Sequence, residues 1–76
     1  MKNIYEVKIY ESEEDYDIGE AFSYGIYSDL EIAKDDLEII IDFNCYYSGV
    51  VENRFNGKEE FSLFYEQEKN IEEENV

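Results

Sequence analysis

Carboxylates are the side chains of this sequence whose spacing could do chemistry, and one set of them recurs with the period of an α-helix. Glu31, Asp35, Glu38 and Asp42 follow one another at intervals of four, three and four residues. On a helix they lie within about 60° of one another. We call these four residues the acidic ladder. Its charges rise by about 4.5–6 Å per step and span roughly 16 Å, a spacing comparable to the phosphate repeat of a nucleic-acid strand.

A row of like charges on a helix is ordinarily a solvated face, and this alternative stands beside a functional one. A solvated face usually mixes the two signs of charge, so that residues three or four apart form ion pairs. The acidic ladder stacks like charges instead and has only Lys34 near it in the sequence. Because the repulsion costs stability, the arrangement favours a binding role for the ladder.

The same helical segment carries two apolar stripes. The stripe centred on Leu37 has the spacing of a core face and comprises Leu30, Ala33, Leu37, Ile40 and Ile41. Ile32, Ile39 and Phe43 lie on another side of the helix, and we call them the outer stripe. One helix on one sheet cannot bury both stripes. The outer stripe therefore either packs against a long loop or Tyr46, or forms an interface with a partner or a second copy of the chain.

Catalytic and metal-binding chemistry lack their usual residues. The sequence has no histidine, no G-x-S-x-G motif and no glycine-rich phosphate loop. Residues 15–19 are similar to the opening of a calcium loop, but Gly19 comes one position early and no glutamate stands at the twelfth position. We expect only weak, unselective cation binding in this segment, by Glu13, Glu14, Asp15 and Asp17. The sequence predicts no enzyme, no cofactor and no specific metal site.

The single cysteine and the apolar runs bear on the compartment. Cys45 cannot form an intramolecular disulfide and has no histidine to activate it, so we interpret it as a small apolar residue at a helix end. Residues 1–6 lack the apolar run of a signal peptide, and no stretch approaches the ~20 apolar residues of a membrane span. We expect a cytoplasmic protein.

The overall charge restricts the partners. The 76 residues include 21 acidic and 6 basic ones, which gives a net charge of −15. Such a chain repels nucleic acids and anionic membranes, and it attracts basic proteins. Its hydrophobic fraction of 43%, with 17% aromatic residues, is nevertheless too high for a disordered chain. The length suits one domain.

Hydrophobic periodicity predicts the first three elements. Residues 3–11 alternate, with Tyr5, Val7 and Ile9 on one side, and form a first strand. Residues 11–20 are acidic and aperiodic, so we expect a mobile loop. Residues 21–27 resume the alternation through Phe22, Tyr24 and Ile26 and form a second strand. A helix over residues 29–43 then follows, with Ser28 and Glu31 as its capping box and Asn44 as its end signal.

The remaining residues predict a hairpin and a tail. Two β-rich runs, 46–55 and 58–66, are separated by Asn56-Gly57, which favours a two-residue turn. The expected pairs are Phe55 with Lys58, Arg54 with Glu59, Glu52 with Phe61 and Val50 with Leu63, which places Val50, Phe61, Leu63 and Tyr65 on one face. The predicted fold is α+β with the order β-β-α-β-β: a small, mostly antiparallel four-stranded sheet with one helix on a face. Residues 1–66 form the single domain and 67–76 a flexible acidic tail.

In size, charge and ladder spacing, the chain resembles a functional class, the small acidic nucleic-acid mimics of bacteriophages and mobile elements. This class includes anti-restriction proteins, uracil-DNA glycosylase inhibitors and anti-CRISPR proteins. The resemblance implies an inhibitor, in the cytoplasm of a bacterial host, that binds the basic nucleic-acid-binding surface of a host enzyme. The members of this class have unrelated folds, so it assigns no residue roles. From their charge and spacing we expect the ladder and the outer stripe to contact the partner. The alternative is a regulatory interaction module or homodimer that uses the outer stripe, with acidity serving only solubility.

Overall fold

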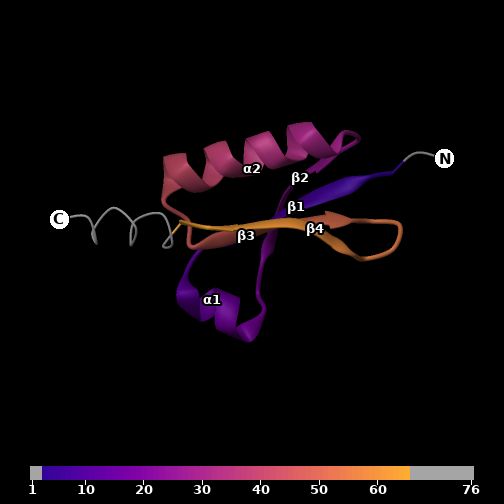
Figure 1. Ribbon diagram of the computed structural model, residues 1–76. Helices are drawn as coiled ribbons and strands as arrows, with labels where there is room; N and C mark the ends of the chain where they lie inside the picture. The colour runs from indigo at the N-terminus through magenta and orange to yellow at the C-terminus, as the bar shows by residue number, and fades with distance from the viewer. Residues whose placement is uncertain (1–2, 66–76) are drawn as a thin grey trace.

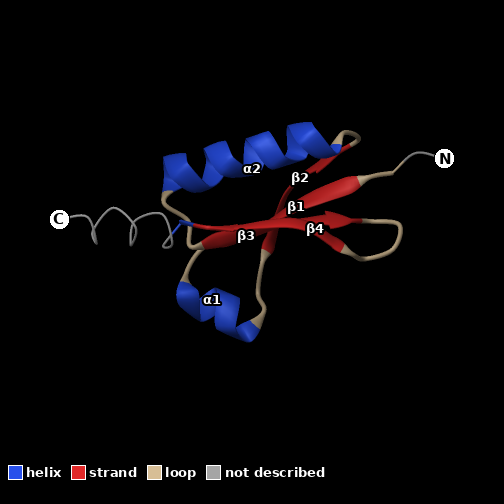
Figure 2. Cartoon of the chain, in the orientation of Figure 1, coloured by secondary structure: helices blue, strands red, loops and turns tan. Residues whose placement is uncertain are grey.

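The chain folds into a four-stranded antiparallel sheet with a helix on each side (Figures 1 and 2). The structure is a computed structural model and describes residues 3–65. The predicted tail, residues 67–76, lies outside the described residues. The elements in chain order are β1 (Tyr5–Tyr10), α1 (Glu13–Ile18), β2 (Phe22–Tyr27), α2 (Leu30–Asn44), β3 (Ser48–Asn53) and β4 (Glu59–Phe64).

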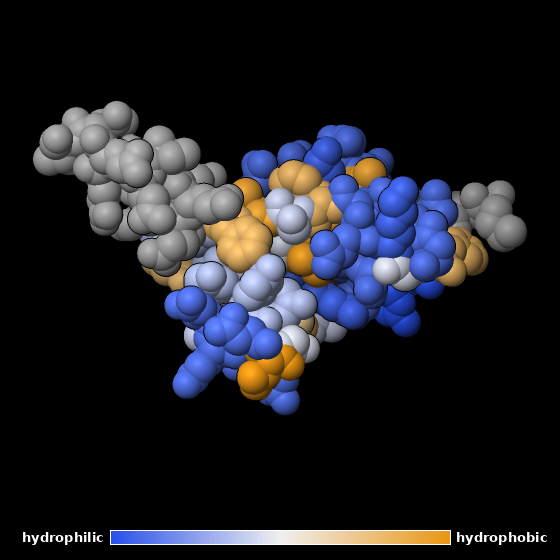
Figure 3. Space-filling model, turned by 60° about the horizontal axis from the view of Figure 1, so that its bottom comes forward, coloured by the Kyte–Doolittle hydropathy of each residue, from blue (hydrophilic) through white to orange (hydrophobic). Residues whose placement is uncertain are grey.

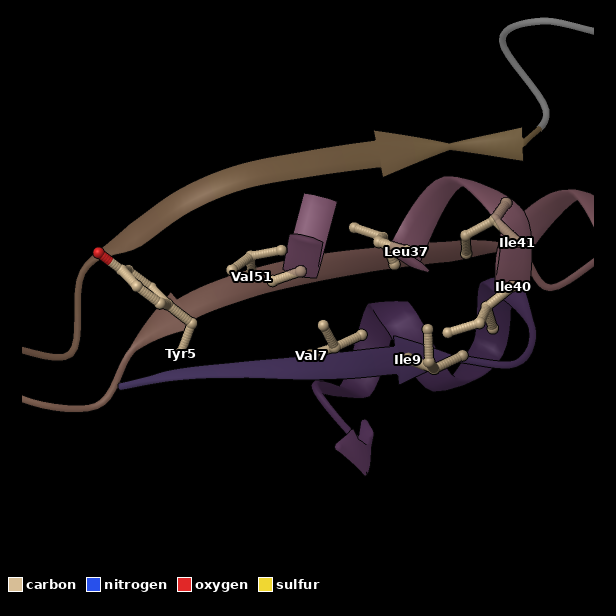
Figure 4. Close-up of a cluster of buried hydrophobic side chains, with 8 residues drawn as sticks. Tyr5, Val7, Ile9, Leu37, Ile40, Ile41 and Val51 are labelled. Atoms are coloured by element: carbon tan, nitrogen blue, oxygen red, sulfur yellow. The ribbon is translucent and has the colours of Figure 1, made fainter. Parts of the chain in front are cut away.

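The core lies between α2 and one face of the sheet (Figure 4). Alternation in β1 turns Tyr5, Val7 and Ile9 towards α2, as predicted, because successive side chains of a strand point to opposite faces. The helix meets them with its predicted core stripe, of which Leu37 is fully buried. The α+β fold with a four-stranded antiparallel sheet is therefore confirmed.

The strand order is β2-β1-β3-β4. Both β2 and β3 run antiparallel to β1, which lies between them. They are therefore parallel to each other, and α2 makes the long connection that parallel strands require. This crossover holds α2 over the centre of the sheet and turns the opposite side of the helix away from it.

The predicted loop over residues 11–20 is wrong, because α1 forms within it. Ser12 caps this helix by accepting a hydrogen bond at 3.2 Å from the Asp15 amide. Gly19 ends it in the left-handed conformation, with φ of 75°, which costs glycine little. Acidic residues in the first turn also favour a helix N-terminus. A helix of six residues is too short to show a period, which is why the sequence pattern missed it.

The start of α2 also differs from the prediction by one residue. Asp29, not Ser28, is the cap, and its Oδ1 accepts hydrogen bonds from the amides of Glu31 at 2.8 Å and Ile32 at 3.1 Å. Both Asp and Ser are good cap residues, so adjacent candidates are hard to separate by pattern alone. At the other end the helix includes Asn44, and Cys45 adopts the left-handed conformation with φ of 58°.

The hairpin forms, but its predicted register is wrong. The connection is longer than Asn56-Gly57, because Asn53 closes it: its amide donates to the Lys58 carbonyl at 2.8 Å and its carbonyl accepts from the Gly57 amide at 2.7 Å. Its Oδ1 also accepts from the Phe55 amide at 2.8 Å. The actual pairs include Val51 with Phe61, Val50 with Ser62 and Glu52 with Glu59.

This register gives Val50 and Arg54 other neighbours than those predicted. Val50 lies on the sheet face away from α2, whereas Val51 joins Phe61, Leu63 and Tyr65 at the core. Arg54 does not pair with Glu59; its Nη1 lies 3.3 Å from Oε1 of Glu6 on β1.

The second strand forms where predicted, but it exposes its alternating apolar residues. The register between β1 and β2 shifts between Val7 and Lys8, as at a β-bulge. Phe22, Tyr24 and Ile26 are all exposed, and Tyr27 instead packs against the core. This strand is an edge of the sheet.

Candidate functional site

The acidic ladder lies on the solvent face of α2, as predicted. Buried Ala33, Leu37, Ile40 and Ile41 fix the rotation of the helix, so the residues on its opposite side point away from the sheet. All four ladder residues are exposed: Glu31, Asp35, Glu38 and Asp42. The fold therefore presents these carboxylates together, along one regular element.

Cations do not balance this row of charge. Among the described residues, Lys34 forms the ladder's one ion pair, with its Nζ 3.7 Å from Oε2 of Glu31. The same Nζ lies 5.2 Å from the centre of the Phe61 ring, on the β4 side of the helix. In residues 3–65, no lysine or arginine forms an ion pair with Asp35, Glu38 or Asp42. These three carboxylates are available to cations of another molecule.

The C-terminal half of the ladder borders a hollow between α2 and β4. This hollow has a volume of about 400 Å³, and Glu38 and Asp42 line it together with Leu63 and Tyr65. A pair of carboxylates beside an apolar and aromatic wall matches an arginine side chain, whose guanidinium binds carboxylates while its methylene stem covers apolar surface. The geometry thus suits a basic, partly apolar partner surface.

The outer stripe is exposed beside the ladder. The relative exposures of Ile32, Ile39 and Phe43 are 54%, 64% and 84%. The Tyr46 ring does not cover them; it contacts the Phe22 ring instead, with 5.9 Å between the ring centres. Of the two arrangements considered for this stripe, the described residues adopt the exposed one. Apolar residues and unpaired carboxylates therefore share one surface of α2.

The second acidic set lies on the other side of the sheet. Glu13, Glu14, Asp15 and Asp17 belong to α1, so this set is helical rather than part of a loop. Since α1 and α2 lie on opposite faces (Figure 1), one flat partner surface cannot contact both sets. The structure does not bring the two predicted acidic sites together.

The structure places Cys45 at the exposed C-terminal end of α2. Its Sγ lies 3.6 Å from the Tyr65 hydroxyl, so this side chain is not part of the apolar core. Among residues 3–65, no three His, Cys, Asp or Glu side chains are grouped so that they could hold a metal ion. Within the same residues, neither helix has the length and apolar character needed to cross a bilayer.

Two charged or polar contacts have shifted pKa values. The hydrogen bond from Lys8 to Glu52, at 3.0 Å, raises the pKa of the lysine. Burial, together with a hydrogen bond to Asp36, raises the pKa of Tyr27 to about 12. Both stabilise the ordinary protonation state at neutral pH, so neither residue is prepared for proton transfer.

The sequence analysis missed an aromatic cluster on the face away from α2. Tyr16 of α1 contacts Tyr10, Tyr47 and Phe64, with ring centres 5.1, 5.6 and 5.1 Å away. The signal for it was the pair of cap residues Ser12 and Gly19, which make residues 13–18 helical and place Tyr16 over the sheet.

Comparisons of the chain with protein-family models, curated proteins and solved structures find no match.

Proposed function

We propose that this protein is an acidic inhibitor that imitates nucleic acid and occupies the basic nucleic-acid-binding surface of an enzyme. The observation that carries the proposal is a row of exposed carboxylates on α2, three of which form no ion pair with the described residues. The net charge of −15 would speed association with a basic surface. Binding through a regular helix keeps the spacing of the charges fixed.

The outer stripe supplies the specificity that charge alone lacks. Electrostatic attraction steers association, but it discriminates poorly between one basic surface and another. Exposed Ile39 and Phe43 lie on the same helix as the ladder, where they would bury apolar surface against the partner and fix the register of binding. In its sharpest form the proposal is an anti-CRISPR or other anti-defence protein, acting in the cytoplasm of a bacterial host and without enzymatic activity.

A second function is favoured by the exposure of the outer stripe itself. Three large apolar side chains exposed by 54–84% on one helix are typical of a protein interface. On this alternative the chain is a regulatory interaction module or a homodimer, and its acidity serves solubility. A homodimer through this face would bring two acidic ladders close together, which favours a foreign basic partner over a second copy.

The first experiment identifies the partner. The immobilised protein is incubated with bacterial lysate, and bound proteins are identified after competition with a double-stranded DNA or RNA oligonucleotide. Under mimicry, nucleic-acid-binding enzymes are retained and are displaced by the oligonucleotide and by salt. Retention that is indifferent to both, or self-association alone in analytical ultracentrifugation, favours the second function.

The second experiment tests the ladder against the purified partner. One variant carries Glu31→Gln, Asp35→Asn, Glu38→Gln and Asp42→Asn. The matched control removes four exposed acids from the α1 region: Glu13, Glu14, Asp17 and Glu20. Asp15 stays unchanged, because it is partly buried in the first turn of α1.

Under mimicry the ladder variant loses far more affinity than the control, since desolvated charge contacts contribute on the order of 2–5 kcal/mol and peripheral charges almost nothing. Equal losses would show that only net charge matters. If neither set matters but Phe43→Ala abolishes binding, the outer stripe is the interface and the second function holds.

A further inference from the structure

A second hollow lies on the face of the sheet away from α2, beneath α1. Its volume is about 310 Å³. Its walls are the rings of Tyr10 from β1, Tyr16 from α1 and Phe64 from β4, with Val50 among the residues beneath them. Glu59, Ser48 and Ser62 complete the lining. The view that brings this side of the molecule forward shows a band of pale and orange side chains between strongly hydrophilic regions (Figure 3).

The rings stand at steep angles to one another. The Tyr16 ring is inclined by 78° to that of Tyr10 and by 73° to that of Phe64, with both pairs of ring centres 5.1 Å apart. Because rings in such edge contacts do not stack flat on one another, they do not cover both faces of each ring. Three rings that enclose a common volume in this way form the kind of aromatic cage that binds organic cations through the negative faces of the rings.

The charges around the hollow also favour a cation. Glu59 is the charged residue in the lining, and no lysine or arginine of residues 3–65 takes part in it. Lys8 pairs with Val50 across β1 and β3, but its ammonium is held by Glu52 at 3.0 Å. An anion would be repelled by Glu59 and by the net charge of −15.

The size and composition of the hollow narrow the kind of cation. A volume near 310 Å³ lies at the small end of ligand sites, which hold drug-sized molecules at about 300–1,000 Å³. A bare divalent metal ion needs several oxygen ligands, whereas the lining supplies one carboxylate. A methylated ammonium group offers positive charge together with an apolar surface, and it matches both the rings and Glu59.

We propose that this hollow binds a methylated ammonium group, either as a free small cation or as a methylated lysine side chain of another protein. The site lies on the opposite face from the acidic ladder and does not depend on the ladder's function. Its principal residue is Tyr16, because this ring contacts both other ring walls.

The experiment is an NMR titration of the whole protein with tetramethylammonium chloride. The control ligands are sodium chloride at the same ionic strength and tert-butanol, a neutral molecule of similar shape. We expect tetramethylammonium to shift the aromatic signals of Tyr10, Tyr16 and Phe64, and the two controls to leave them nearly unchanged. Equal shifts with tert-butanol or sodium chloride, or no shift at tens of millimolar, would overturn the proposal.

Single variants distinguish the loss of a cation-binding group from the loss of the fold. Tyr16→Leu should weaken binding by about tenfold, as expected for the loss of one desolvated cation–π contact. Tyr16→Phe should retain the affinity because the ring remains, and Glu59→Gln should weaken binding while every ring stays in place. Phe55→Leu, at an aromatic residue outside the hollow that is 57% exposed, is the matched control.

If Tyr16→Leu loosens α1, Glu59→Gln still decides the matter, and wild-type affinity in both variants overturns the proposal. A short peptide containing trimethyllysine, compared with the free cation, tells which source binds more tightly.

Discussion

At Gly49 the backbone of β3 passes directly beneath α2. A Cβ atom added there would collide with Cδ1 of Leu37 and would lie 3.1 Å from Cδ1 of Ile9 and 3.2 Å from the Lys8 carbonyl oxygen. The fully buried Leu37 has little room to move. We expect Gly49→Ala to lower the free energy of unfolding by about 1–3 kcal/mol, the usual cost of overpacking, as measured by urea denaturation.

Leu37→Ala provides the control for this prediction. It removes the atoms with which the new methyl group collides, so Gly49→Ala should cost clearly less in that background. An equal cost in both backgrounds would show that the contacts with Ile9 and the Lys8 carbonyl oxygen, and not the approach of Leu37, make glycine necessary at this position.

Tyr27 gives the molecule a pH dependence in the alkaline range. Its folded-state pKa is raised to about 12 from an unfolded value near 10. The stabilisation is therefore fully present below about pH 10, and it is lost as the pH rises from about 10 to 12 because only the unfolded state releases the proton. Tyr27→Phe should lose less stability than the wild type across this range.

The measurement for Tyr27 is the difference in unfolding free energy between wild type and Tyr27→Phe at each pH. Taking the difference cancels every contribution to the pH dependence that the two proteins share. A difference that stays constant from pH 9 to pH 12 would contradict the raised pKa.

At the scale of the element, the cap of α2 offers a direct test of the structure against the sequence pattern. Asp29→Ala removes the acceptor for the amides of Glu31 and Ile32. It should reduce stability by about 0.5–2 kcal/mol in thermal or urea unfolding. Ser28→Ala, which is adjacent and exposed, should have almost no effect, and Asp29→Asn should preserve most of the stability. The reverse order of effects would restore the capping box at Ser28.

The sequence predicted correctly the elements whose pattern repeats several times, and it missed the one whose residues do not complete a repeat. The core faces of β1 and α2 could be predicted because each element repeats its period several times. The burial of one side of each element confirms them. The six residues of α1 are held by Ser12, Gly19 and the packing of Tyr16. The first two are local signals that an acidic composition obscured, and the packing of Tyr16 is a tertiary contact that no local pattern contains.

The hairpin register failed for a similar reason. An Asn-Gly pair favours a two-residue turn locally, but Asn53 forms three hydrogen bonds of 2.7–2.8 Å to backbone groups of a longer connection, two through its own backbone and one through its Oδ1. Its buried position within the sheet decides between the two turns. Relative to the predicted register, the actual one exchanges the sheet faces of Val50 and Val51. Val50 therefore lies beneath the aromatic hollow, which the sequence could not predict.

At the scale of the whole molecule, the strand order required information that the sequence pattern does not carry. Beyond the hairpin, the sequence did not determine which strands are neighbours, and the fold places β1 and β3 in the centre. That order sends α2 across one face and leaves the other to α1. It is also what separates the two acidic sets, so the ladder was predicted as a set of residues, but its isolation from the α1 acids was not.

The surplus of negative charge should make folding itself dependent on salt. Among residues 3–65, three acidic side chains form ion pairs: Glu52 with Lys8, Glu31 with Lys34 and Glu6 with Arg54. Salt weakens these pairs, but it also screens a much larger number of repulsions, and at 0.1 M the screening length is only about 10 Å. We therefore expect the melting temperature at pH 7 to rise as sodium chloride is added.

The ladder variant is the control for this effect. Neutralising Glu31, Asp35, Glu38 and Asp42 removes four charges from a net charge of −15, so its melting temperature should start higher at low salt and rise less steeply. If the wild-type melting temperature falls with moderate salt, the ion pairs of Lys8 and Arg54 outweigh the repulsion. The acidic surface would then cost the fold nothing, which would remove the argument that a retained cost reflects a binding role.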